Sequence, residues 1–289
     1  MRDVARRRAE WLLTTPSLGW LAVLVLLPTL IVFAIAFKPA DPFGGIGAGW
    51  TLDTLRGLAR SSYLGIAWRT LYLSLLATAA CLCLATPMSY FMARAPRRWQ
   101  RRLLLLVVVP FWTCFLVRVF AWKVLLHPDG ALKHALSALG LVSYTATLLY
   151  TPGAVLLVMV YTSLPFAVLP IYAAAEKFDF KLLEAARDLG ATSLGAFWAV
   201  FMPGIRRGIL SAALLVFIPS LGSYIIPDIV GGPSQVMIGN VIAQRVFSDR
   251  NLPHAAALSA ALTLAVLAPM LAALLLRRKE TGSGRGTGL

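Results

Sequence analysis

Charged residues are scarce in this chain. They make up 13% of its 289 residues, against about 25% in a typical soluble domain, while hydrophobic residues make up 59%. A soluble domain of this size cannot bury so much apolar surface, and the apolar residues occur in runs longer than core helices or strands need. The composition therefore excludes most soluble enzymes and predicts a protein that crosses a membrane several times.

Residues typical of catalytic and metal sites are also few. The histidines form no HExxH motif and no Ser/His/Asp group, and the cysteines lie in apolar runs without CxxC spacing. These residues are His127, His134, His254, Cys81, Cys83 and Cys114. No lysine follows a glycine, so the chain lacks the GxxxxGK[ST] loop that binds ATP. We therefore expect no catalytic residue, no metal ligand and no cofactor in this chain, and we expect any ATP to be bound by partner subunits.

Acidic residues are outnumbered: 27 Lys and Arg oppose 12 Asp and Glu, for a net charge of +15. In a soluble protein this excess would indicate a nucleic-acid partner. Here the basic residues lie at the ends of the apolar runs, which is the pattern of membrane topology. We expect contact with membrane lipid and none with nucleic acid.

The apolar runs predict six membrane-spanning helices, because a bilayer core about 30 Å thick needs roughly 20 apolar residues in helical form. They cover residues 18–37, 70–93, 103–122, 152–174, 208–226 and 255–276. Several contain proline, which neighbouring helices make tolerable in membranes and which predicts kinks. The first run has some features of a signal peptide, but it is longer than the usual apolar core of about 7–15 residues, so we expect it to be retained.

Most Lys and Arg lie before the first run, between the second and third, between the fourth and fifth, and after the sixth. Since basic loops stay on the cytoplasmic side, both termini are predicted to be cytoplasmic. The predicted organisation is a cytoplasmic segment at residues 1–17, a transmembrane domain at 18–276 and a cytoplasmic tail at 277–289. The tail is glycine-rich, and we expect it to be disordered.

The cytoplasmic loop at residues 177–207 has the pattern of a helix-turn-helix. Asp179 is a predicted N-cap, Gly190 is suited to the left-handed conformation that ends a helix, and Thr192 or Ser193 caps a second helix that runs to Pro203. One interpretation is a surface helix on the bilayer. The other is a contact with a second protein, in which small side chains allow close approach and charged ones pair around it. The residues concerned are Ala185, Ala186, Glu184, Arg187 and Asp188.

At this loop the chain resembles the membrane subunits of bacterial ATP-binding-cassette (ABC) importers. Their signature is EAA, three residues, G, nine residues and I-x-L-P; here it reads Glu184-Ala185-Ala186, Gly190, then Val200-Phe201-Met202-Pro203. The resemblance implies an all-α membrane protein of the type I importer (MetI-like) permease fold in the bacterial cytoplasmic (inner) membrane. It further implies that residues 184–190 form a coupling helix that docks in an ATPase subunit, with Pro203 closing the motif.

The same resemblance implies the partners: a second permease subunit, two ABC ATPase subunits and an extracytoplasmic substrate-binding protein. Further stretches are similar to the polyamine (spermidine/putrescine) permease group. They are Pro110-Phe111-Trp112-Thr113 with Arg118, Leu164-Pro165-Phe166, Gly222-Ser223-Tyr224 with Pro227-Asp228, and Ile238-Gly239-Asn240. A departure is Arg206-Arg207 before Gly208, where relatives commonly carry proline. The resemblance therefore implies a polyamine as cargo.

A pathway for a polyamine needs carboxylates or aromatic faces, the latter attracting ammonium groups by ~0.5–2 kcal/mol each. Our candidates are Trp112, Phe115, Tyr224 and Asp228. The alternative is structural: the aromatic residues form an interfacial belt, and Asp228 caps a helix or neutralises Arg118. An arginine inside a span is costly in lipid, so Arg118 is expected to face the bundle interior or to reach outward.

Other functions stay open on the sequence alone. A secondary transporter would need carboxylates for a coupling ion within the spans and usually internal repeats, and neither is visible. Within the importer class, the cargo could instead be another small organic solute or an oxyanion, because permeases for these share the EAA loop. Prolines 110, 165 and 219 mark either bending points or static kinks.

Overall fold

The computed structural model of the protein describes residues 2–58, 61–143 and 145–283. Within these ranges the chain is helical and contains no strand beyond one isolated antiparallel bridge between Ala40 and Ile46. The chain divides into two compact units. One combines Met1–Leu64 with Val241–Leu289, and the other is Gly65–Asn240.

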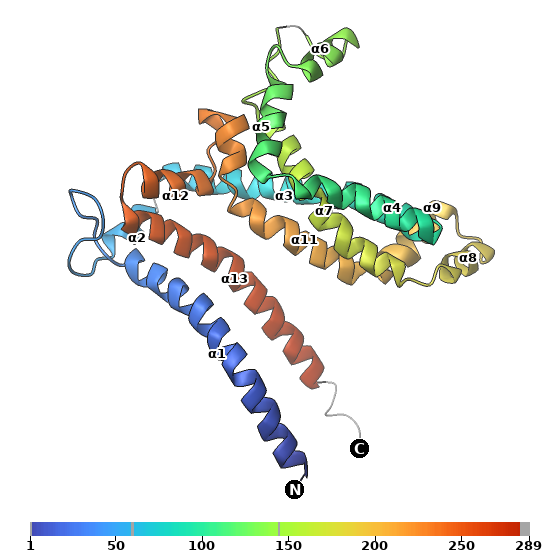
Figure 1. Ribbon diagram of the computed structural model, residues 1–289, viewed down its shortest axis with the longest axis horizontal. Helices are drawn as coiled ribbons and strands as arrows, with labels where there is room; N and C mark the ends of the chain where they lie inside the picture. Colours follow the sequence, from blue (N-terminus) through green and yellow to red (C-terminus); the bar gives the residue numbers. More distant parts are fainter. Residues whose placement is uncertain (1, 59–60, 144, 284–289) are drawn as a thin grey trace. The chain divides into compact units, whose positions relative to one another are not determined.

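Figure 1 labels the helices. The first unit contains α1 (Arg2–Ala36), α2 (Asp53–Leu58) and α13 (Leu252–Ser283). Helices α3 (Ser61–Arg94) and α12 (Ile238–Phe247) begin in one unit and end in the other. The second unit contains α4 (Arg97–Val108), η1 (Val109–Trp112), α5 (Phe115–Leu126), α6 (Ala131–Ala138), α7 (Pro152–Glu176), α8 (Lys181–Asp188), α9 (Ser193–Ala196), η2 (Phe197–Phe201), α10 (Met202–Gly204), α11 (Arg206–Leu221), η3 (Pro227–Gly231) and η4 (Pro233–Gln235).

In the first unit, α1 and α13 lie side by side (Figure 1). Their buried contact is made of alanines, Ala36 on α1 with Ala256, Ala257 and Ala260 on α13, and these small side chains let the two backbones approach closely. Most large apolar side chains of α1 between residues 18 and 31 are exposed. An exposed apolar surface of this length is typical of a helix that contacts lipid or another membrane helix.

In the second unit, α7 packs against both α3 and α11. The Ser89 hydroxyl of α3 donates to the Val168 carbonyl of α7 at 3.3 Å. Against α11 the approach depends on Gly208, because a Cβ there would lie 2.5 Å from the Cβ of Ala174 and 2.8 Å from the carbonyl oxygen of Pro170. The absence of a side chain at position 208 therefore sets the spacing of these two helices.

Three predicted spans are present as unbroken helices that are long and apolar enough to cross a membrane: Thr14–Ala36, Tyr63–Arg94 and Pro152–Glu176. They contain the predicted runs at 18–37, 70–93 and 152–174 almost completely. The sixth run, 255–276, falls within α13, which continues to Ser283. The predicted tail therefore begins as helix, and residues 284–289 lie outside the described residues.

The third predicted span, residues 103–122, is wrong as one helix, because the segments Arg97–Trp112 and Phe115–Leu126 meet at an angle of 91°. Pro110 lacks a backbone N–H and crowds the preceding turn. Thr113 and Cys114 then take extended conformations, with ψ of 147° and 135°. The Pro110 carbonyl accepts hydrogen bonds from both the hydroxyl and the N–H of Thr113, at 2.7 and 3.4 Å, and these bonds close the end of the helix.

The fifth predicted span, residues 208–226, also ends early. Helix α11 stops at Leu221, and Gly222 follows at its C-cap. At its start, α11 is bent by 72° relative to Ser193–Gly204. The 72° bend lies where the loop at residues 177–207 joins α11.

Candidate functional site

The first candidate site is the loop at residues 177–207, which folds as the sequence predicted. The Asp179 carboxylate accepts a hydrogen bond from the Lys181 N–H at 3.1 Å, although α8 begins one residue later than a direct N-cap would place it. Gly190 has φ of +92°. The N–H groups of Gly190 and Ala191 donate to the carbonyls of Arg187 and Ala186 at 2.9 and 3.0 Å. This pair of bonds is a Schellman motif, which ends α8 at a defined residue.

The second helix of the loop begins at Thr192, whose hydroxyl accepts the Gly195 N–H at 3.0 Å. Of the two capping residues that the sequence allowed, the structure therefore uses Thr192. The chain continues through α9 and the π-helical turn η2 to α10, which contains Pro203 and ends at Gly204. The predicted helix-turn-helix is confirmed to within one residue at this end.

The predicted contact residues of this loop face outward. Glu184, Ala185, Arg187, Asp188, Gly190 and Pro203 are exposed, and Ala186 is half-buried. Leu183 is the inward anchor, with 6% exposure. Among the described residues, Glu184, Arg187 and Asp188 take part in no ion pair. Their charges are therefore available to a second protein.

Exposed apolar side chains surround these charges. Leu182, Leu189, Leu194 and Trp198 are all more than half exposed, and Leu189 reaches 90%. Leu182 lies near the start of α8, Leu189 in the turn after it, Leu194 on α9 and Trp198 on η2. An apolar surface with charged residues between its members is typical of a protein-protein contact.

An aromatic cluster fixes the loop to α3. Phe201 is fully buried, and its ring centroid lies 4.9 Å from Tyr90 of α3, 5.2 Å from Phe178 and 5.3 Å from Phe197. Phe180, just before α8, joins the cluster at 6.0 Å from Tyr90. This cluster was not predicted from the sequence. Its signal was the set of phenylalanines that flank the EAA motif on both sides.

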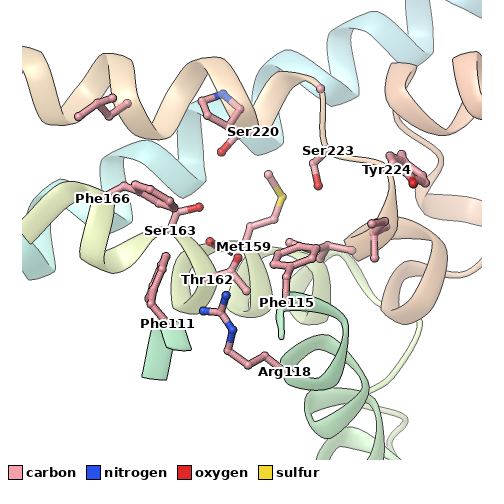
Figure 2. Close-up of a pocket in the computed structure, with 15 residues that line it drawn as sticks. Phe111, Phe115, Arg118, Met159, Thr162, Ser163, Phe166, Ser220, Ser223 and Tyr224 are labelled. Carbon is pink, nitrogen blue, oxygen red and sulfur yellow. Dashed lines mark hydrogen bonds between the residues drawn. The ribbon is translucent and has the colours of Figure 1, made fainter. Parts of the chain in front are cut away.

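The second candidate site is a cavity of about 470 Å³ within the second unit. Figure 2 shows side chains of η1, α5, α7 and the end of α11 around it. The lining residues are Phe111, Phe115, Arg118, Met159, Thr162, Ser163, Phe166, Leu215, Pro219, Ser220, Gly222, Ser223, Tyr224, Ile225 and Ile226. They combine apolar and aromatic surfaces with several hydroxyls, and they include no Asp or Glu.

Arg118 is the charged residue of this lining. Its side chain extends from α5 toward Phe111 and Thr162 (Figure 2). The guanidinium carbon lies 4.5 Å from the ring centroid of Phe111 and 5.9 Å from that of Phe115. The Arg118 Nε is buried and has no hydrogen-bond partner within the described residues. Arg118 was expected either to face the bundle interior or to reach outward, and in the structure it faces the interior.

The structure separates the four predicted pathway residues. Phe115 and Tyr224 line the cavity. Trp112 does not, and it is 79% exposed. Asp228 is exposed on η3, outside the lining, and makes no ion pair with Arg118. The alternative in which Asp228 neutralises Arg118 is therefore wrong.

The reason lies in the turn that follows α11. Helix α11 ends at Leu221, with Gly222 as its C-cap. Further along, the Asp228 N–H donates to the Tyr224 carbonyl at 3.1 Å. This turn carries Asp228 away from the cavity that Tyr224 enters. The sequence analysis also missed lining residues, among them Phe111, Thr162 and Ser220. Hydroxyls that line a cavity and hydroxyls that bond to their own helix look alike in sequence.

Neither site has the side chains of a metal centre. Within the described part of the chain, no group of three His, Cys, Asp or Glu residues is close enough to hold a metal ion. The loop is suited to contact with another protein. The cavity offers a bound molecule weak contacts with aromatic faces and hydroxyls.

Comparison with known proteins gives consistent results. The profile of the family described as "Binding-protein-dependent transport system inner membrane component" matches residues 85–281. The spermidine/putrescine transport system permease protein PotB of Escherichia coli strain K12 is 38% identical over 246 residues, which cover 85% of this chain and 90% of that protein. PotB of Haemophilus influenzae is 37% identical over 246 residues, with 85% and 86% coverage.

A solved structure shows the same fold. It is the crystal structure of a bacterial alginate ABC transporter in complex with an alginate pentasaccharide-bound periplasmic protein. One of its chains matches with a TM-score of 0.71 at 17% sequence identity, covering 100% of this chain and 99% of that chain. At this identity the likeness concerns the fold alone.

Proposed function

The chain belongs to the family of binding-protein-dependent transport system inner membrane components, and from this premise we propose that it is a permease subunit of an ATP-driven importer for a polyamine such as spermidine or putrescine. The resemblance first drawn from the EAA motif is confirmed, and the chain is a multi-pass protein of the inner membrane. The observation that carries the choice of cargo is the 38% identity to a PotB protein over 90% of its length.

The proposed topology has six spans with both termini in the cytoplasm. Three unbroken helices, two bent helix pairs and the apolar segment Leu252–Ala268 of α13 supply them. The proposed boundaries are those predicted from sequence: a cytoplasmic segment at 1–17, the transmembrane domain at 18–276 and a cytoplasmic tail at 277–289. The position of the Lys- and Arg-rich loops supports this orientation.

In the proposed assembly, the chain pairs with a second permease subunit, two ATPase subunits and an extracytoplasmic binding protein. The loop at residues 177–207 docks in an ATPase cleft through Glu184, Ala185, Ala186, Arg187 and Asp188, and Gly190 and Pro203 set its shape. Exposed, unpaired charges among apolar side chains support this role. ATP is bound and hydrolysed by the partner subunits, so this chain holds no cofactor.

The cavity is proposed to be part of the translocation pathway, with Phe115 and Tyr224 in contact with the cargo. Two aromatic faces and several hydroxyls can guide an alkylammonium ion without holding it tightly. Asp228 is exposed on η3 and is proposed to attract the cation before it reaches the cavity. Trp112, with 79% exposure, is proposed to contact lipid or the second permease subunit at the edge of the pathway.

A second candidate cargo is an oxyanion. The observation that favours it is Arg118, whose guanidinium lies in a cavity without carboxylates. Titration of the partner binding protein with polyamines, amino acids and oxyanions distinguishes the two. Tight binding of spermidine or putrescine alone is the expected result, and a preference for sulfate, molybdate or phosphate would contradict the polyamine proposal.

A further inference from the structure

The positive charge of Arg118 is difficult to reconcile with a cargo that is itself a cation. A fixed positive charge lies inside the cavity through which a polycation is proposed to pass, and the described lining offers no carboxylate to neutralise it. Like charges in a site of low dielectric repel strongly. A polyamine ammonium group and the Arg118 guanidinium would therefore repel each other in this cavity.

The ring faces nearest to Arg118 are groups that an ammonium ion would also use, and two hydroxyl oxygens belong to the same cavity lining. Its guanidinium lies over the face of Phe111 at 4.5 Å and near Phe115 at 5.9 Å, and ring faces at these distances attract cations. Thr162 donates its hydroxyl hydrogen to the Val158 and Met159 carbonyls at 2.8 and 3.1 Å, so its oxygen presents lone pairs. Ser220 likewise donates to Val216 at 2.7 Å. The cavity is thus a cation site already occupied by a side chain of the same protein.

The fold offers a way to vacate that site. Phe111 belongs to η1, before the 91° break, whereas Arg118 and Phe115 belong to α5, after it. Phe111 is held from the other side by Phe166 of α7, whose ring centroid lies 5.1 Å away. If the angle between η1 and α5 changed at Thr113 and Cys114, Arg118 would move away from Phe111. Phe111 would meanwhile stay packed against Phe166 of α7.

We propose that Arg118 is a tethered cation that occupies the ammonium site of the cavity, and that the cavity accepts a polyamine only when Arg118 has moved off Phe111. This inference rests on the proposed function and names the residue that keeps the cavity's affinity for its cargo low. Low affinity in the resting state favours release toward the cytoplasm and prevents the cargo from staying in the pathway.

The test measures spermidine binding to the assembled complex in lipid nanodiscs, without ATP and without the binding protein. Arg118→Met removes the charge and keeps an unbranched, flexible side chain, although a shorter one. It should lower the Kd for spermidine at least tenfold relative to the wild type. Arg118→Lys keeps a cation over the rings and should bind spermidine as weakly as the wild type does.

Lys123→Met is the matched control, because it makes the same change of charge on the same helix at a residue outside the cavity lining. It should leave the Kd unchanged. If the methionine variant fails to assemble, Arg118→Gln removes the charge and retains a hydrogen-bond donor, and it should show the same increase in affinity.

The outcomes separate the two proposals. If the wild-type complex imports spermidine but neither neutral variant gains affinity, the tethered-cation role is overturned and the polyamine function stands. An equal gain in the lysine variant would overturn it as well, because the charge would then be irrelevant. If the wild-type complex imports an oxyanion and no polyamine, the proposed function fails, and this inference fails with it.

Discussion

Gly190 and Gly208 are glycines for different physical reasons. Gly190 has space around its Cα but a φ of +92°, which side chains with a Cβ rarely adopt. Gly208 has an ordinary helical backbone but no space, since a Cβ there would come within 2.5 Å of the Ala174 Cβ. The first requirement is readable from a glycine that follows a short helix. The second depends on which helix packs against α11, and the sequence does not show that.

A series of substitutions at Gly190 tests the turn that ends α8. A left-handed residue with a Cβ is strained by about 1–2 kcal/mol, and asparagine tolerates the conformation best. We expect ATP-driven uptake to fall in the order Gly190→Asn, Gly190→Ala, Gly190→Val, with the valine variant roughly five- to thirtyfold below the wild type. Membrane insertion is measured alongside as the control. Equal uptake in all three variants would contradict a role for the turn.

Gly208→Val tests the packing of α11 on α7. Overpacking a close helix contact destabilises by about 1–3 kcal/mol, so the melting temperature of the purified complex should fall. Gly65→Ala is the matched control, because a Cβ at residue 65 meets nothing within 4 Å. That variant should melt at or above the wild-type temperature. A drop of the same size in both would refute the packing account.

At the scale of elements, local signals predicted helix ends well and helix breaks poorly. The turn at Gly190 and the cap at Thr192 depend on a few neighbouring residues, and both were predictable. The 91° break after Pro110 was predicted only as a kink. Proline occurs inside intact helices of the same chain, as Pro165 does in α7. Whether a proline bends or breaks a helix depends on the partners that its freed carbonyls find.

The features of the two candidate sites also differ in whether they could be predicted from the sequence. The exposure of the charged residues in the loop at 177–207 follows from the helical period, so it could be predicted from the sequence. The placement of Asp228 could not, because it depends on a turn between Gly222 and Gly231 that has no periodic pattern. Phe111 and Arg118 meet across a helix break, and sequence spacing gives no measure of such a contact.

The aromatic cluster gives a prediction at this scale. Phe201→Ala removes a fully buried ring and should destabilise the local packing by about 3–5 kcal/mol. The loop at residues 177–207 would then be held less firmly to α3. We expect faster amide hydrogen exchange in residues 181–204 and ATP hydrolysis that is less well coupled to uptake. Phe91→Ala, at a neighbouring residue that is 70% exposed, should change neither quantity.

At the scale of the whole molecule, topology follows from charge and hydrophobicity. In a background in which Cys81, Cys83 and Cys114 are replaced, a single cysteine in residues 94–102 should react with an impermeant thiol reagent only from the cytoplasm. A cysteine in residues 41–53 should react only from outside. Reversed labelling would overturn the orientation that the basic loops predict.

The central claim is that this chain couples ATP hydrolysis in partner subunits to the import of a polyamine. The most direct measurement is uptake of radiolabelled spermidine into proteoliposomes that contain the full complex, with the binding protein outside and ATP inside. We predict uptake that requires ATP, the binding protein and this chain, and that Glu184→Lys abolishes without loss of assembly. Uptake that persists without ATP or in the Glu184→Lys complex, or a complex that imports an oxyanion and no spermidine, would contradict the account.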